Sequence, residues 1–288
     1  MKLRIATRSS PLARWQAEQV ASLLVQAEPG ISIEYVPVQT APDRDLSQPI
    51  AAFGGKGAFC KGVQRELLEG RADIAVHSAK DMQSLPPEGL VIGAYPERGA
   101  VHDCLVGATR DQLGPDSIVA TGSARRWALM HDLCPGVNRQ DLRGNIARRL
   151  SVLDGDVDAI VMAAAALERL GLEPAVVDHL DPEHFVPQVG QGAMAVETRE
   201  DNPEVRRLLA TIDHPATRIT VEAERDFLRE LGGDCDLPAG AYARLEADGK
   251  IVIRGVLVVD DVLRRCELVD VPETNPGRLL AERLAQPF

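Results

Sequence analysis

The sequence predicts an α/β fold in which two doubly wound domains precede a small α+β domain with an antiparallel sheet. Three observations predict it. Between residues 3 and 80, segments whose apolar residues have the spacing of a strand alternate with segments that have the spacing of a helix. The same alternation begins again near residue 104. After residue 216, strands with apolar residues at every second position, joined by short turns, dominate. A chain of 288 residues is long enough for two or three such domains.

The first third of the chain has the alternation expected of a mostly parallel sheet. Apolar residues recur at helical spacing after Ser10 and Pro11, and proline is favoured in the first turn of a helix. The expected elements are a strand at 3–7, a helix from Ser10, a strand at 31–38, a helix that follows the glycine-rich turn 54–57 and ends at Leu68, and a strand at 73–76.

The second and third domains follow from the same patterns. Strands are expected at 104–107, 117–120, 139–142 and 158–162, with helices at 124–133, at 146–153 and from 163 to Leu170. Beyond a helix at 220–231, strands at 239–245, 251–259 and 264–271 alternate with turns, and a last helix covers 276–284.

Composition limits the classes of function. The formal net charge of −11 argues against a nucleic-acid surface and against binding to anionic membranes. No apolar run approaches the roughly 18 residues of a membrane span, and residues 1–8 lack the apolar centre of a signal peptide.

The five cysteines form no CxxC pair, which predicts reduced thiols in a cytoplasmic protein. His179, Asp181 and His184 are too few ligands for a metal site, so no metal is expected.

Arginine is concentrated in one segment of this acidic chain. Residues 121–150 hold six arginines and two acidic residues. Such a segment suits a polyanionic small molecule. A solvated helix face would give the same pattern, and charge alone does not separate the two.

Seven short motifs occur in order along residues 1–240. They are RIATRSSPLA at 4–13, GGKG at 54–57 with Phe59, DIAVHSAKD at 73–81, TGSARR at 121–126, LRGN at 142–145, VGQGA at 189–193, and Glu224-Arg225 ahead of Gly233-Asp234-Cys235. In these motifs the chain resembles the porphobilinogen deaminases, also called hydroxymethylbilane synthases. The last 45 or so residues match only in general pattern.

The resemblance implies both a domain organisation and an activity. Two domains like type II periplasmic binding proteins, at 1–96 with 190–212 and at 97–189, would precede a cofactor-bearing domain at 213–288. The implied activity is a transferase reaction of tetrapyrrole (haem) biosynthesis. It joins four porphobilinogen molecules into linear hydroxymethylbilane on a covalently bound dipyrromethane cofactor.

Asp81 and Lys80 are the catalytic residues that the resemblance implies. At the end of a short buried strand, the Asp81 carboxylate would stabilise the cation left when an aminomethylpyrrole loses ammonia, and would move protons. Lys80 would pair with carboxylates of the substrate and cofactor and help to keep Asp81 ionised. Without the resemblance, a Lys–Asp pair that satisfies loop backbone groups would explain the same two residues.

An arginine cradle is the expected binding site, because a guanidinium binds a carboxylate through two parallel hydrogen bonds. The resemblance assigns to the cofactor Ser78, Lys80, Thr121, Gly122, Ser123, Arg125, Arg126, Arg143, Gly144, Asn145 and Gln191, and to the substrate Arg8, Ser10, Arg149 and Arg169. Ser10, Thr121, Ser123 and Asn145 also suit ordinary helix N-caps that need no ligand, and this alternative stays open.

Cys235 is the implied attachment point of the dipyrromethane, through a thioether. A thiolate is a soft nucleophile that suits addition to a cationic pyrrole. Asp234 stands where the family has a second glycine, and with Asp236 it would raise the pKa of the thiol. Other departures from the family pattern are Gln83, Arg148, Gln188 and the segment 100–102.

Two other classes of function stay open beside the enzyme. A non-catalytic paralogue would hold a pyrrole or another polycarboxylate anion in the arginine cradle without needing Asp81 or Cys235. An ordinary solute-binding protein of the same fold would need an export signal, which the sequence does not show. We expect the enzyme, acting as a cytoplasmic monomer on porphobilinogen, with no nucleic-acid or membrane partner.

Overall fold

The computed structural model describes residues 1–40, 57, 59–233 and 237–286. They form two compact units, residues 1–99 with 192–222 and residues 100–191 with 223–288, and each is described by itself. None of the helices in the described part of the chain could span a membrane. The division into three domains stays a prediction.

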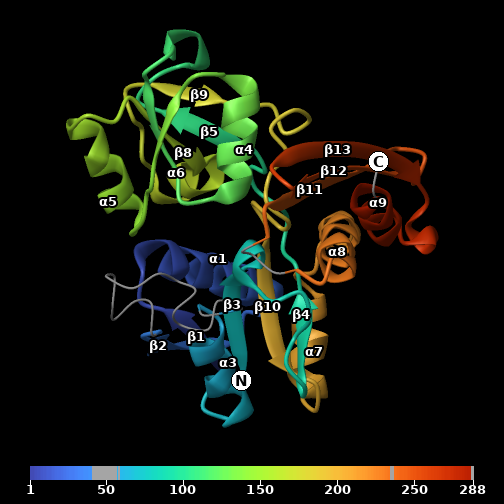
Figure 1. Ribbon diagram of the computed structural model, residues 1–288. Coiled ribbons are helices and arrows are strands. Elements are labelled where there is room, and N and C mark those ends of the chain that lie inside the picture. The colour runs from blue at the N-terminus through green and yellow to red at the C-terminus, as the bar shows by residue number, and fades with distance from the viewer. Residues whose placement is uncertain (41–56, 58, 234–236, 287–288) are drawn as a thin grey trace. The chain divides into compact units, whose positions relative to one another are not determined.

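The first unit is built on a five-stranded sheet of order β2-β1-β3-β10-β4 (Figure 1). Helices α1 and α3 pack on β1 and β3, and α7 packs on β4 and β10. The strands are β1 (Lys2–Arg8), β2 (Ser32–Val38), β3 (Ile74–Ser78), β4 (Leu90–Ala94) and β10 (Met194–Arg199). The helices are α1 (Pro11–Ala27), α3 (Lys61–Leu68) and α7 (Pro203–Ala210), and α8 (Pro215–Glu230) begins in this unit.

The sheet is mixed, which corrects the expectation of a mostly parallel one. β1 is parallel to β2 and β3, whereas β10 is antiparallel to both β3 and β4. A helix between two strands returns the chain to the same end of the sheet and so makes the parallel pairs. β10 instead follows the point at which the chain re-enters the unit at Gly192, so no such helix sets its direction.

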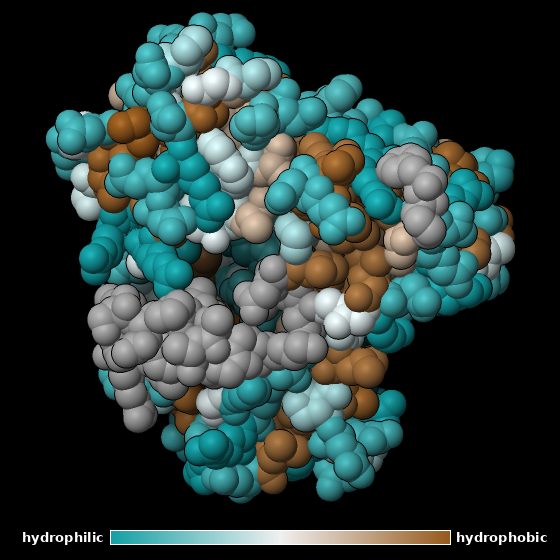
Figure 2. Space-filling model, in the orientation of Figure 1, coloured by the Kyte–Doolittle hydropathy of each residue, from teal (hydrophilic) through white to brown (hydrophobic). Residues whose placement is uncertain are grey.

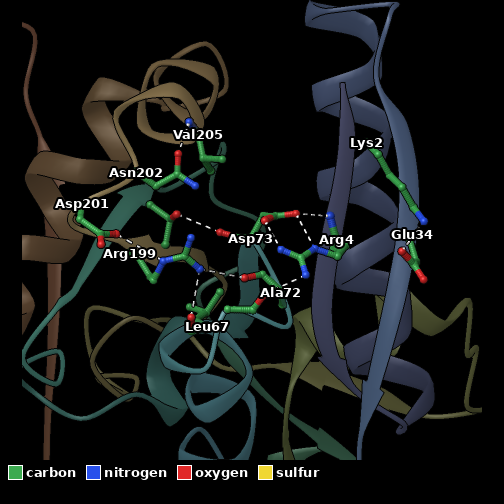
Figure 3. Close-up of polar contacts among 12 residues, drawn as sticks. Lys2, Arg4, Glu34, Leu67, Ala72, Asp73, Arg199, Asp201, Asn202 and Val205 are labelled. Carbon is green, nitrogen blue, oxygen red and sulfur yellow. Dashed lines mark hydrogen bonds and ion pairs between the residues drawn. The ribbon is translucent and has the colours of Figure 1, made fainter.

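Polar contacts fix the end of the sheet at which β3 begins (Figure 3). The Asp73 carboxylate accepts hydrogen bonds from the Arg4 backbone nitrogen at 2.8 Å and from its Nη2 at 2.7 Å. Burial would raise the pKa of Asp73, but the bonds and charge of Arg4 lower it overall. Thr198 Oγ1 donates to the carbonyl of Asp73 at 2.9 Å. These contacts tie β1, β3 and β10 together at the end of β3 opposite Ser78.

The second unit contains a sheet of similar build, with the order β7-β6-β8-β5-β9. β6 is parallel to β7 and β8, whereas β5, the first strand after the chain enters this unit, is antiparallel to β8 and β9. The strands are β5 (Asp103–Val106), β6 (Ile118–Ala120), β7 (Asn138–Gln140), β8 (Ala159–Ala163) and β9 (Val177–His179). The helices are α4 (Ala124–Leu133), α5 (Ile146–Leu150) and α6 (Ala164–Leu170).

A three-stranded antiparallel sheet completes this unit. It consists of β11 (Ala239–Leu245), β12 (Ile251–Val259) and β13 (Val262–Asp270), and α9 (Pro276–Ala285) packs on β12 and β13. Val256 of β12 joins the apolar core that contains Leu129 of α4 and Val161 of β8. Two α/β sheets followed by a small α+β part confirm the predicted fold class.

Each five-stranded sheet has an apolar core of its own. Leu3, Ile5, Leu24 and Ile74 are fully buried in the first unit, and burial of such side chains is the main favourable contribution to folding. The face drawn in Figure 2 is mostly hydrophilic, as expected for a chain with 26% charged residues, and a group of apolar residues lies right of its centre.

We expect Gly277→Ala to destabilise the protein. A Cβ at this position in the first turn of α9 would lie 1.8 Å from the Ala223 carbonyl oxygen and 2.9 Å from the Phe227 nitrogen, both backbone atoms of α8. The two helices would have to move apart, and overpacking of this kind costs about 1–3 kcal/mol. Urea denaturation measures the loss. Gly30→Ala, where a Cβ meets nothing within 4 Å, is the control, and an equal loss in both variants would contradict the explanation.

Candidate functional site

In the first unit, the predicted residues gather where β1 and β3 end. The two strands are parallel, with Ala6 opposite Ala75, so their carboxyl ends lie at the same edge of the sheet, where ligands commonly bind. Arg8 is the last residue of β1 and Ser78 the last of β3. Ser10 caps α1, since its hydroxyl accepts a hydrogen bond from the Ala13 nitrogen at 3.3 Å. The capping role that the sequence left open for Ser10 is therefore present.

Asp81 and Lys80 lie in a 3₁₀ turn (Ala79–Asp81) directly after β3. The backbone of this turn is fixed at three points. The Ala79 nitrogen donates to the Ala193 carbonyl at 3.0 Å, the Met82 nitrogen donates to the Ala79 carbonyl at 3.2 Å, and the Cys60 thiol donates to the Asp81 carbonyl at 3.3 Å. Asp81 and Lys80 themselves are half-buried.

Two neighbouring side chains are oriented at the same edge. The Arg8 guanidinium carbon lies 4.2 Å from the ring centroid of Phe59, a cation–π contact. Ser78 Oγ accepts a hydrogen bond of 2.8 Å from Gln16 Nε2 of α1. Since a hydroxyl that accepts one hydrogen bond can still donate its own proton, Ser78 remains able to bind an anionic group.

A buried ion pair lies in the strands next to this edge, and the sequence analysis missed it. His77 Nε2 lies 2.9 Å from Glu197 Oε2, and both side chains are buried. Gln64 Nε2 donates to both oxygens of Glu197, at 3.1 and 3.0 Å. Burial alone would lower the pKa of His77, but Cys60 and the Glu197 carboxylate raise it to about 10, so the imidazole is protonated near neutral pH.

In the second unit, the predicted hydrogen-bond donors lie where β6 and β7 end. The Thr121 nitrogen donates to the Gln140 carbonyl at 2.9 Å. A Cβ at Gly122 would lie 2.5 Å from the Leu142 carbonyl oxygen, so only glycine allows the two loops to approach this closely. Thr121, Gly122 and Ser123 are thus adjacent to the loop 142–145 that carries Gly144 and Asn145.

Both helices at this edge have side-chain N-caps. Ser123 Oγ accepts from the Arg126 nitrogen at 3.3 Å, and Asn145 Oδ1 accepts from the Arg148 nitrogen at 3.0 Å. Arg149 Nε donates to the Gly144 carbonyl at 2.9 Å, which places that side chain over the same loop.

Two further predicted arginines differ in burial. Arg143 is exposed, whereas Arg169 of α6 is half-buried. Burial lowers the pKa of Arg169, partly offset by Glu168. Arg143 belongs to the loop 142–145 itself, whereas Arg169 lies on α6, outside the two loops.

Arg125 and Arg126 do not face solvent, because both guanidinium groups bind the buried carboxylate of Asp103. Arg125 Nη2 lies 2.9 Å from Asp103 Oδ2, and Arg126 Nη2 lies 2.7 Å from Oδ1. Burial would raise the pKa of Asp103, but the charges and hydrogen bonds of the two arginines hold it well below its usual range. Burial lowers the pKa of Arg125.

Gln191 joins this cluster. Its Nε2 donates to Asp103 Oδ1 at 2.8 Å and to the Val101 carbonyl at 2.9 Å, and the residue is fully buried. Arg125, Arg126 and Gln191 were predicted from the sequence, whereas Asp103 was not. The available signal was the arginine pair itself, because two adjacent buried guanidinium groups require a buried counter-ion.

Cys235 lies outside the described residues, as do Asp234 and Asp236. Among the described cysteines, Cys60, Cys104, Cys134 and Cys266 are free thiols. Burial and the nearby Asp103 carboxylate raise the pKa of Cys104 to about 12, so this thiol is a poor nucleophile.

Comparison with known families decides the identity of the fold and its site. Residues 3–207 match the model of the porphobilinogen deaminase dipyrromethane cofactor-binding domain, and residues 218–284 match the model of the porphobilinogen deaminase C-terminal domain. The chain belongs to the porphobilinogen deaminase family. A curated porphobilinogen deaminase of Nitratidesulfovibrio vulgaris (strain DSM 19637 / Miyazaki F) is 44% identical over 260 residues, which are 89% of this chain and 82% of that protein.

Membership confirms the predicted class of function. The chain is a transferase of porphyrin biosynthesis, a hydroxymethylbilane synthase whose first matched segment is the domain that binds the dipyrromethane cofactor. No comparison favours the non-catalytic paralogue.

Two solved structures are similar to parts of the chain. An ancestral cationic amino acid solute binding protein is 16% identical, with 73% of this chain and 88% of that chain covered and a TM-score of 0.46. The methionine binding protein MetQ is 15% identical, with 75% and 92% covered and a TM-score of 0.46.

Proposed function

We propose that Asp81 is the acid–base residue of this hydroxymethylbilane synthase and that Lys80 and Arg8 bind the carboxylates of the substrate. The arginines of the second unit hold the carboxylates of a dipyrromethane that is attached to Cys235. The observation that carries the proposal is the convergence of Arg125, Arg126 and Gln191 on one buried carboxylate. Among the described residues, two guanidinium groups lie against one carboxylate, which leaves one positive charge in excess at this buried place.

The residues present fit a carboxylated pyrrole cofactor. Arg126 Nε is buried and has no hydrogen-bond partner in the described part of the chain, so a donor is available beside the excess positive charge. The Thr121 and Ser123 hydroxyls accept backbone N–H groups at 3.2 and 3.3 Å, yet each can still donate its own proton. The capping role and the binding role are therefore compatible. When bound, the dipyrromethane supplies the covalent starting point for chain growth.

Asp81 has the properties that the proton chemistry needs. Loss of ammonia from the aminomethyl group of porphobilinogen leaves a cation on the substrate, and a carboxylate held beside it lowers the energy of that charge. The 3₁₀ turn fixes the backbone of Asp81, and its side chain is half-buried. The same carboxylate accepts and returns protons at the pyrrole nitrogen.

The intact mass of the purified protein tests the attachment. We expect the wild type to be heavier than its sequence by two pyrrole rings and to gain further mass with porphobilinogen, whereas Cys235→Ser stays unmodified. Cys266→Ser, which changes another free thiol, should keep the adduct. An unmodified wild-type chain that binds porphobilinogen reversibly would indicate the non-catalytic binding protein instead.

We further propose that the protein acts as a cytoplasmic monomer without nucleic-acid or membrane partners. The net charge of −11 and the free thiols among the described residues support this proposal.

A further inference from the structure

Asp103 contacts three residues assigned to cofactor binding, although no motif marks it as part of the site. Its Oδ1 accepts from Arg126 Nη2 at 2.7 Å and from Gln191 Nε2 at 2.8 Å, and its Oδ2 accepts from Arg125 Nη2 at 2.9 Å. The carboxylate is fully buried, and the two arginines are 3% and 7% exposed. These bonds use both oxygens of a carboxylate that solvent does not reach.

Each guanidinium has a second anchor in the same unit. Arg125 Nη1 donates to the Val186 carbonyl at 2.6 Å, and Arg126 Nη1 donates to the Val161 carbonyl at 3.3 Å. Two adjacent buried cations repel each other strongly in a medium of low dielectric constant, and the carboxylate between them offsets that repulsion. Asp103 therefore determines where the two side chains lie, and Arg126 Nε keeps no partner among the described residues.

Gln191 connects this cluster to the segments through which the chain enters and leaves the second unit. The chain enters at Ala100 and leaves after Gln191. Gln191 Nε2 bonds the Val101 carbonyl as well as Asp103 Oδ1. A ligand carboxylate at Arg126 would compete for that guanidinium with Asp103 Oδ1, the same oxygen that Gln191 contacts. Ligand binding at the arginine pair is thereby linked to the segment at Val101.

We propose that Asp103 is a positioning residue, which orients Arg125 and Arg126 for a ligand carboxylate and, through Gln191, joins the arginine pair to the two connecting segments. The inference rests on the proposed function, because it takes the arginine pair as the binding site. Asp103 itself contacts no ligand.

Asp103→Asn tests the inference, because asparagine keeps the shape and removes the charge. The matched control is Glu183→Gln, since Glu183 also bridges two arginines, Arg244 at 2.5 Å and Arg254 at 2.6 Å, on a side chain that is 32% exposed. Steady-state kinetics with porphobilinogen and NMR of the arginine Nε–H groups are measured on the holoenzymes.

We expect Asp103→Asn to lower kcat by about ten-fold or more, the loss of one charged hydrogen bond, because Arg125 and Arg126 hold the attached cofactor to which porphobilinogen is added. The KM for porphobilinogen should change less. The Nε–H signals of Arg125 and Arg126 should shift and lose protection from exchange. Glu183→Gln should stay within about two-fold of the wild-type kcat. A wild-type or higher kcat in Asp103→Asn would show that Asp103 only reduces the positive charge, and unchanged arginine signals would show that it does not orient them; either result overturns the proposal.

Two further measurements distinguish a failure of this inference from a failure of the proposed function and from a variant that does not fold. If the wild type does not act on porphobilinogen, the proposed function fails, and the arginine signals still decide the role of Asp103. If Asp103→Asn does not fold, Gln191→Met removes both Gln191 bonds at similar volume. Faster hydrogen exchange at the backbone amides of 101–103 is then expected, and unchanged exchange overturns the link to Val101.

Discussion

Asp81→Asn is expected to keep the adduct on Cys235 while porphobilinogen turnover falls by about 10²- to 10⁴-fold. Asparagine has the size of aspartate and can keep the 3₁₀ turn, whose fixed points are backbone atoms. It cannot accept and return a proton, and it does not neutralise a cation on the substrate. Steady-state kcat measures the loss, and intact mass measures the adduct.

The control for this variant is Asp111→Asn. Asp111 also lies in a 3₁₀ turn, Arg110–Gln112, but it is exposed and belongs to none of the predicted sites. Its turnover should equal that of the wild type. Wild-type turnover in Asp81→Asn would remove Asp81 from the mechanism, whereas loss of the adduct together with turnover would show that the residue acts in cofactor assembly.

Elements with a strong local period could be predicted from the sequence. β11 and β12 have the predicted bounds, because each is a mostly apolar run that ends at a clear turn. α4 also has its predicted bounds, with Ser123 as the N-cap. α8 begins at Pro215 rather than at the predicted Thr220, because proline at the first position starts a helix before its apolar period becomes visible.

Elements that depend on distant segments were missed. β10 was not predicted, because the buried polar residues Glu197 and Thr198 interrupt its apolar pattern. Glu197 is tolerated there because His77 and Gln64, both far away in the sequence, lie beside it. The counter-ion Asp103 was missed for the same reason. Sequence patterns identify a charged residue, but its partner becomes visible only when the fold brings the two together.

Glu197→Gln is expected to lower the free energy of unfolding by about 3–5 kcal/mol, the cost of removing one partner of a buried ion pair. Glutamine can still bind Gln64, but it leaves the buried His77 without its carboxylate partner. Chemical denaturation at neutral pH measures the loss. Glu34→Gln is the control, because the Lys2–Glu34 pair is exposed at 65% and 46% and should contribute less than about 1 kcal/mol.

The pH dependence of stability separates this ion pair from a simple packing effect. The pKa of His77 is raised from 6.5 to about 10 in the folded protein, so this group stabilises the fold fully below about pH 6.5. Between these two values the folded state binds one more proton than the unfolded state, so the free energy of unfolding falls as pH rises, by up to about 1.4 kcal/mol per pH unit. Glu197→Gln removes one of the two groups that raise the pKa of His77, whereas Cys60, the other, remains. The slope from this group should therefore become smaller in the variant, and parallel curves for the two proteins between pH 6.5 and 10 would contradict the assignment of a charged His77.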